Sequence, residues 1–95
     1  MSLKATLPML AGSRARAQQV LCGIDADLQG HEVSLNGQIL VAASIGFTDE
    51  LVAELLVRRE AAAMQLTSCS DEFVELVLER AAVHGVEDRV KVVPS

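Results

Sequence analysis

Apolar and polar positions alternate with two different periods along this chain, and the two periods predict strands and helices in turn. In residues 3–9, apolar side chains occupy every second position, which is typical of a strand. In residues 73–82, they recur at intervals of three and four, the spacing of one helix face. Pro8 cannot donate a backbone hydrogen bond and therefore suits the end of the first strand.

Serine residues mark the starts of three predicted helices, because a serine oxygen accepts a hydrogen bond from a free amide of the first turn. The expected caps are Ser13 for the first helix, Ser44 or Thr48 for the second, and Ser70 for the third. Gly30 and Gly85 are expected to end the first and third helices, since glycine readily adopts the left-handed conformation found there. Asp49 and Glu50 are expected in the first turn of the second helix, where the helix dipole favours acids.

Three more apolar runs, at residues 33–41, 63–66 and 90–93, are short and predict strands. Asn36-Gly37 interrupts the first of these runs, and its flanks are too short for a good hairpin, so we expect a bend or bulge there. The resulting order of strands and helices, β-α-β-α-β-α-β, predicts an α/β fold. It is a single small layer of about four mostly parallel strands alternating with three helices.

Length and charge narrow the possible functions. The 95 residues predict one domain spanning residues 1–95, with a core at about residues 5–93. Eight Lys and Arg against 13 Asp and Glu give a net charge of −5, which disfavours a nucleic-acid partner. No apolar run is long enough for a membrane span, and no signal peptide is recognised. Cys22 and Cys69 are expected to be buried or half-buried thiols, which favours a reducing cytoplasm.

No spacing in the sequence assembles a catalytic or metal-binding set. The chain has two histidines and no Cys-x-x-Cys, Gly-x-Ser-x-Gly or phosphate-loop pattern. Asp49 and Glu50 are adjacent, as are Asp71 and Glu72, but neighbouring residues on a helix point about 100° apart and do not converge on one substrate. We therefore expect a protein that is not an enzyme and that has no cofactor and no metal.

The residues that open the second predicted helix carry a family resemblance. They read Gly46-Phe47-Thr48-Asp49-Glu50-Leu51 and are similar to the Ser-Phe-Ala-Asp-Glu-Leu start found in a STAS-like group of unknown function. The chain thereby resembles the STAS superfamily, the anti-sigma-factor antagonist fold, over about residues 5–93. Gly12-Ser13-Arg14 is similar to the Ser-Arg start of that group's first helix. The family's acidic turn position is Asn36 here, and its phosphoacceptor position is Gly46.

The resemblance implies a cytoplasmic regulatory module that docks on a protein partner, in this family often a kinase-like ATPase of the histidine-kinase-like fold. The docking surface that it implies consists of Asn36, Ser44, Gly46, Phe47, Thr48, Asp49 and Glu50. Ser44 and Thr48 are candidate phosphorylation sites, because a phosphate at a helix N-terminus meets free amides. The same hydroxyls are also suited to simple capping, and Phe47 to anchoring the core.

Two alternatives come from other classes of function. The first is a small-ligand or anion sensor that uses the backbone amides at the start of the second helix, where Gly46 allows close approach. The second is a structural subunit that dimerises through an exposed strand edge. The sequence leaves the oligomeric state and the identity of the partner open.

Overall fold

A four-stranded parallel sheet forms one layer of the protein. The computed structural model describes residues 3–24 and 26–93, so Met1, Ser2, Asp25, Pro94 and Ser95 lie outside the described residues. The strands are β1 (Leu3–Thr6), β3 (Glu32–Asn36), β5 (Ala63–Thr67) and β6 (Val90–Val93), in the order β1-β3-β5-β6. The predicted α/β class and the parallel sheet are confirmed.

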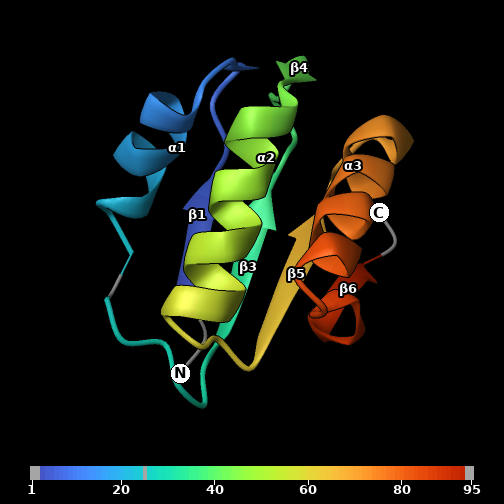
Figure 1. The fold of residues 1–95 in the computed structure, drawn as a ribbon. Coiled ribbons are helices and arrows are strands. Elements are labelled where there is room, and N and C mark those ends of the chain that lie inside the picture. Colours follow the sequence, from blue (N-terminus) through green and yellow to red (C-terminus); the bar gives the residue numbers. More distant parts are fainter. Residues whose placement is uncertain (1–2, 25, 94–95) are drawn as a thin grey trace.

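Three helices lie against one face of this sheet, in front of it in Figure 1. They are α1 (Arg14–Leu21), α2 (Ile45–Val52) with its π-helical continuation η1 (Ala53–Arg58), and α3 (Asp71–Val83). A short 3-10 turn, η2 (Glu87–Arg89), leads into β6. Each successive strand is added on the same side of the previous one, so right-handed crossovers place all the helices on one face.

The covered face of the sheet is apolar and the other face is polar. Leu35, for example, pairs with Ala5 on one side and Leu66 on the other, and both leucines are fully buried under the helices. On the open face, Ser34 donates to the side-chain oxygen of Gln65 (3.1 Å), and Gln65 donates to Glu32 (2.8 Å). Such a polar row suits exposure to water, whereas most all-parallel sheets are covered on both faces.

A second, much smaller sheet lies beyond the ends of β1 and β3. It consists of β2 (Leu10–Ala11) and β4 (Ala42–Ala43), which are parallel to each other. The predicted strands at residues 3–9 and 33–41 are therefore each shorter than expected, because Pro8 ends the first and the bend after Asn36 ends the second. The bend replaces a hairpin, as predicted, and Gly37 fits it because an added Cβ would lie 2.8 Å from Cys69 Sγ.

The predicted helix starts are largely confirmed. Ser13, Ser44 and Ser70 each accept a hydrogen bond from a backbone amide three residues further on, at 3.0–3.2 Å. Of the two candidate caps of the second helix, Ser44 is the cap and Thr48 lies inside α2. Asp49 and Glu50 fall beyond the first turn of α2, so the expectation for these two acids is wrong. Gly85 (φ 72°) ends α3 with the paired Schellman hydrogen bonds, in which Gly85 N donates to Ala82 O and Val86 N donates to Ala81 O.

The first helix ends earlier than predicted. We expected it to reach Gly30, but α1 stops at Leu21. The guanidinium of Arg59, far along the chain, donates to the carbonyl oxygens of Leu21 (3.1 Å) and Ile24 (3.0 Å) and so replaces the next turn of helix. Because the helix stops here, Cys22 is exposed, contrary to expectation.

Candidate functional site

The carboxyl ends of β1, β3 and β5 and the starts of all three helices gather at one end of the molecule, the top of Figure 1. The β2–β4 pair lies at this end as well. The predicted docking residues follow β3 in sequence, so the fold brings their segment to this end.

Three of the predicted docking residues are buried. Phe47 and Thr48 are fully inaccessible, and Glu50 is 8% exposed, because α2 turns them toward the sheet and α1. We therefore correct the expected docking set: these three side chains are not available to a partner in this structure. Thr48 Oγ1 donates to the Ser44 carbonyl oxygen (3.0 Å), so its hydroxyl is also a poor phosphorylation site.

Three other predicted residues shape the turn and the helix start. Asn36 Oδ1 accepts from the Gln38 amide (2.8 Å), and Ser44 Oγ accepts from the Phe47 amide (3.0 Å). Gly46 lies against Arg14, since an added Cβ would lie 3.5 Å from Arg14 Cγ. Each of these residues thus has a structural role, and Ser44 is half-buried rather than fully enclosed.

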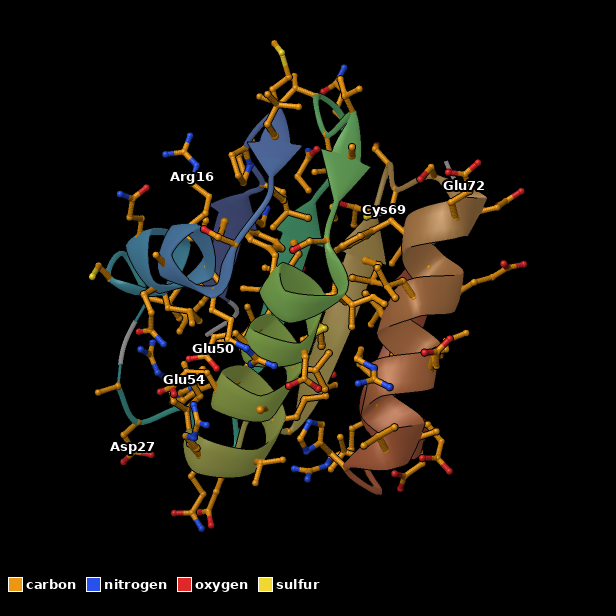
Figure 2. All side chains as sticks on the ribbon, turned by 45° about the horizontal axis from the view of Figure 1, so that its top comes forward. Arg16, Asp27, Glu50, Glu54, Cys69 and Glu72 are labelled. Carbon is orange, nitrogen blue, oxygen red and sulfur yellow. The ribbon has the colours of Figure 1, made fainter. Side chains whose placement is uncertain are left out.

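Asp49 and Glu50 connect the helices to one another. Asp49 contacts Arg14 (3.2 Å) and His84 Nε2 (2.9 Å), which come from α1 and the end of α3. Glu50 accepts a hydrogen bond from Gln18 and pairs with Arg14 (3.4 Å). Figure 2 places Glu50 on the side of α2 that faces α1. Both carboxylates are therefore engaged within the molecule.

The contacts of Asp49 set its protonation. Burial alone would raise the pKa of Asp49, but hydrogen bonds and charges from His84 and Arg14 outweigh burial and hold that pKa below its ordinary value of 3.8. Because the pKa of Asp49 is lower in the folded state, its carboxylate stabilises the fold at pH values above the ordinary pKa. This stabilisation is lost as the pH falls through the lowered pKa of the folded state.

We expect Asp49→Asn to destabilise the protein by about 1 kcal/mol at neutral pH, since its partners are partly exposed. The loss should shrink on acidification, because Asp49 itself then becomes protonated. Urea denaturation between about pH 6 and about pH 2.5 measures this. Glu79→Gln is the matched control, because the Glu79 side chain is 62% exposed. Parallel stability curves for the wild type and Asp49→Asn would contradict the assignment.

Exposed apolar side chains surround the β2–β4 pair. We define the tip patch as Met9, Leu10, Ile39, Val41 and Ile45, each more than half exposed. The patch is held together by the small sheet, in which the Val41 amide donates to the Met9 carbonyl (2.8 Å) and Leu10 is paired with Ala42. Sequence reasoning placed most of these residues in strands and missed their exposure. The signals that point to it are Pro8 and Asn36-Gly37, which end those strands.

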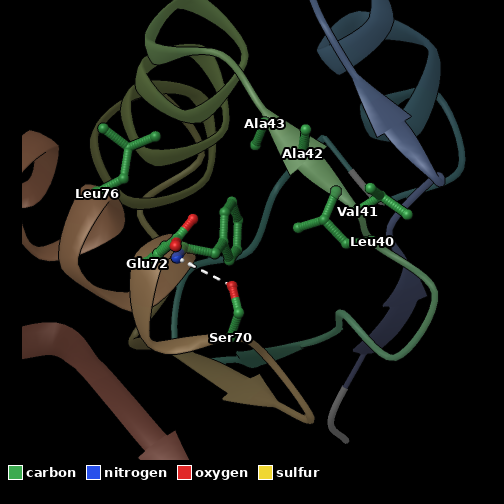
Figure 3. A pocket seen from close by; sticks show the side chains of 8 residues that line it. Leu40, Val41, Ala42, Ala43, Ser70, Glu72 and Leu76 are labelled. Atoms are coloured by element: carbon green, nitrogen blue, oxygen red, sulfur yellow. Dashed lines mark hydrogen bonds between the residues drawn. The ribbon is translucent and has the colours of Figure 1, made fainter.

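A groove of about 290 Å³ adjoins the tip patch. Residues 40–43 form one wall, and the start of α3 forms the other. Figure 3 shows Leu40 and Val41 on one side, with Leu76 and Glu72 on the other. Most residues that line the groove are apolar, polar atoms contribute about as much of its surface as apolar ones, and the acidic Glu72 stands at its rim.

Two other features bear on chemistry. A shallow polar hollow of about 440 Å³ lies on the open face of the sheet, lined by residues that include Lys4, Ser34 and Gln65. Among residues 3–24 and 26–93, no group of three or more His, Cys, Asp or Glu side chains is placed to hold a metal ion. Burial raises the pKa of the half-buried Cys69 thiol, which disfavours the reactive thiolate at neutral pH.

In the same part of the chain, no helix is long and apolar enough to cross a lipid bilayer. The comparisons with known proteins found no matching family model, no matching curated protein and no matching solved structure. Within the described residues, the fold and the site define a small parallel α/β domain with an apolar tip.

Proposed function

We propose that this protein is a non-enzymatic regulatory module of the cytoplasm that docks on a protein partner through the tip patch. The observation that carries the proposal is the cluster of exposed apolar side chains at the carboxyl end of the sheet. Several exposed apolar side chains on neighbouring segments of a small domain are typical of a protein–protein interface, because covering them removes apolar surface from water. Four of the patch residues are large aliphatic side chains, which suit packing rather than chemistry.

The partner class comes from the family resemblance. The STAS-like motif begins at Gly46, directly after the patch residue Ile45, so the motif and the patch occupy the same corner of the fold. A kinase-like ATPase of the histidine-kinase-like fold is therefore the partner that we propose. Ser44, half-buried beside Ile45, is the hydroxyl at which such a partner would act. A phosphate there would stand at the start of α2, where the free amides and the helix dipole favour an anion.

The start of α2 supports docking better than it supports anion sensing. Ser44 Oγ already accepts from the Phe47 amide, and the exposed side chain in the first turn is the apolar Ile45. Arg14, the cation beside Gly46, pairs with two carboxylates of α2. An anion would have to compete with those contacts.

Val41→Asp tests the proposal, because it places a charge on the most exposed residue of the tip patch. We expect partner binding to weaken at least tenfold, since a charge buried in an apolar interface is left without a partner. The measurement is titration calorimetry with a purified kinase-like ATPase of the histidine-kinase-like fold from the same organism. Val83→Asp is the control, because Val83 is similarly exposed but lies at the far end of α3. Equal affinity of the two variants, or no binding by the wild type, would refute the proposed surface.

A further inference from the structure

We infer that the groove between β4 and α3 receives a basic amphipathic helix of the partner. An aliphatic side chain of that helix fills the groove, and its cationic side chains contact Glu72 and Glu75. This inference rests on the proposed function and adds the chemistry of the partner's contact segment.

The size and lining of the groove favour a side chain as its occupant. Small-molecule sites are usually about 300–1,000 Å³, and this groove of about 290 Å³ falls at the lower limit. Leu40, Leu76 and the nearly buried Phe73 supply apolar contacts. The adjoining tip patch extends the apolar surface from the groove to Val41, so a partner helix could place successive apolar residues on both.

The charges at and beside the rim of the groove favour a cationic partner, since Glu72 lines the groove and Asp71 and Glu75 lie near it on α3. Asp71, Glu72 and Glu75 are exposed at the start of α3, and within the described ranges no ion pair engages them. The arginines of the helical layer do not neutralise these acids. Each of the following pairs with Asp49 or Glu54 instead: Arg14, Arg58, Arg59 and Arg80. A second copy of this chain would bring a further net charge of −5, so self-association through this rim is disfavoured.

The backbone at the groove favours a helix over an added strand. A bound strand needs a row of unpaired backbone groups along a sheet edge. The wall of the groove is β4, which has only two residues, so its open edge offers too short a row of backbone groups for strand addition. Side-chain contacts must therefore provide most of the affinity, as they do when an amphipathic helix lies in a groove.

Two synthetic peptides test the inference. They share leucines at helical i, i+3, i+4 and i+7 spacing, and one carries lysines at its polar positions where the other carries glutamates. Amide shifts of the 15N-labelled protein report binding by NMR. We expect the lysine peptide to shift residues 40–43 and 72–76, and the glutamate peptide to shift neither segment. Shifts by the lysine peptide that spread evenly over the surface would overturn the inference.

A charge reversal supplies the second arm. Glu72→Lys with Glu75→Lys should weaken binding of the lysine peptide about tenfold and permit binding of the glutamate peptide. Glu60→Lys with Glu87→Lys makes the same change in net charge on exposed residues outside the groove and should have little effect. If both double variants lose the same affinity for the lysine peptide, the inference is wrong, because the peptide is then attracted only by the net charge of the protein. If the ATPase partner depends on Val41 but not on Glu72 and Glu75, the proposed function stands and this inference fails.

Discussion

Phe47→Ala should destabilise the protein by about 3–5 kcal/mol, the range found when a buried phenylalanine is truncated. Phe47 is fully inaccessible and is the largest of the completely buried side chains among the described residues. It lies in the first turn of α2, where its ring packs into the core shared by the helices and the sheet. A domain of this size has roughly 5–15 kcal/mol of stability in total, so the variant should be close to unfolding.

Urea denaturation followed by far-ultraviolet circular dichroism measures this loss, since the chain has no Trp or Tyr to report by fluorescence. Phe47→Leu is the matched control and should cost less than half as much, because it keeps most of the buried apolar volume. The comparison also separates the two roles proposed for Phe47 from the sequence. A Phe47→Ala variant that keeps its stability and loses partner binding would show that the ring is a docking residue after all.

Arg59→Met should cost about 1–3 kcal/mol, because it removes the guanidinium donor from two carbonyl groups at the end of α1 and leaves the Leu21 carbonyl with the Ile24 amide alone. The guanidinium of Arg59 donates to Leu21 O and Ile24 O, and it pairs with Glu54 at 3.0 Å. Only 13% of the Arg59 side chain is exposed, so water cannot readily replace these contacts. Methionine retains the apolar stem and removes only the donors.

Arg58→Met provides a control one residue away. Arg58 also pairs with Glu54, at 2.8 Å, but its side chain is 56% exposed, and we expect a loss of at most about 1 kcal/mol. Amide hydrogen exchange should show faster opening at the end of α1 in Arg59→Met and not in Arg58→Met. Similar stability and exchange in the two variants would mean that Arg59 does not hold this helix end.

The candidate site was only partly predictable. The STAS-like motif directed attention to residues 36–51, and the exposed patch residues Ile39, Val41 and Ile45 lie inside that range. The motif also marked Thr48 and Glu50, both of which are buried. Helical periodicity shows which residues share a face, but it does not show how many neighbouring elements cover that face. Here α2 lies between α1 and α3, so neighbouring elements cover more of its surface than they would cover on a helix at the edge of the layer (Figure 1).

The sequence by itself determined the parallel α/β class, the serine caps of α1 and α3 and the Schellman ending at Gly85. These features depend on residues within a few positions of one another, so a local pattern contains them. Only the tertiary structure decided where α1 ends, that β2 and β4 pair separately, and that Val41 is exposed while Thr48 is buried. Each of these features depends on segments that are distant in the chain. Arg59, for example, replaces the helical turn after Leu21, whereas Val41 is exposed because no other element covers it.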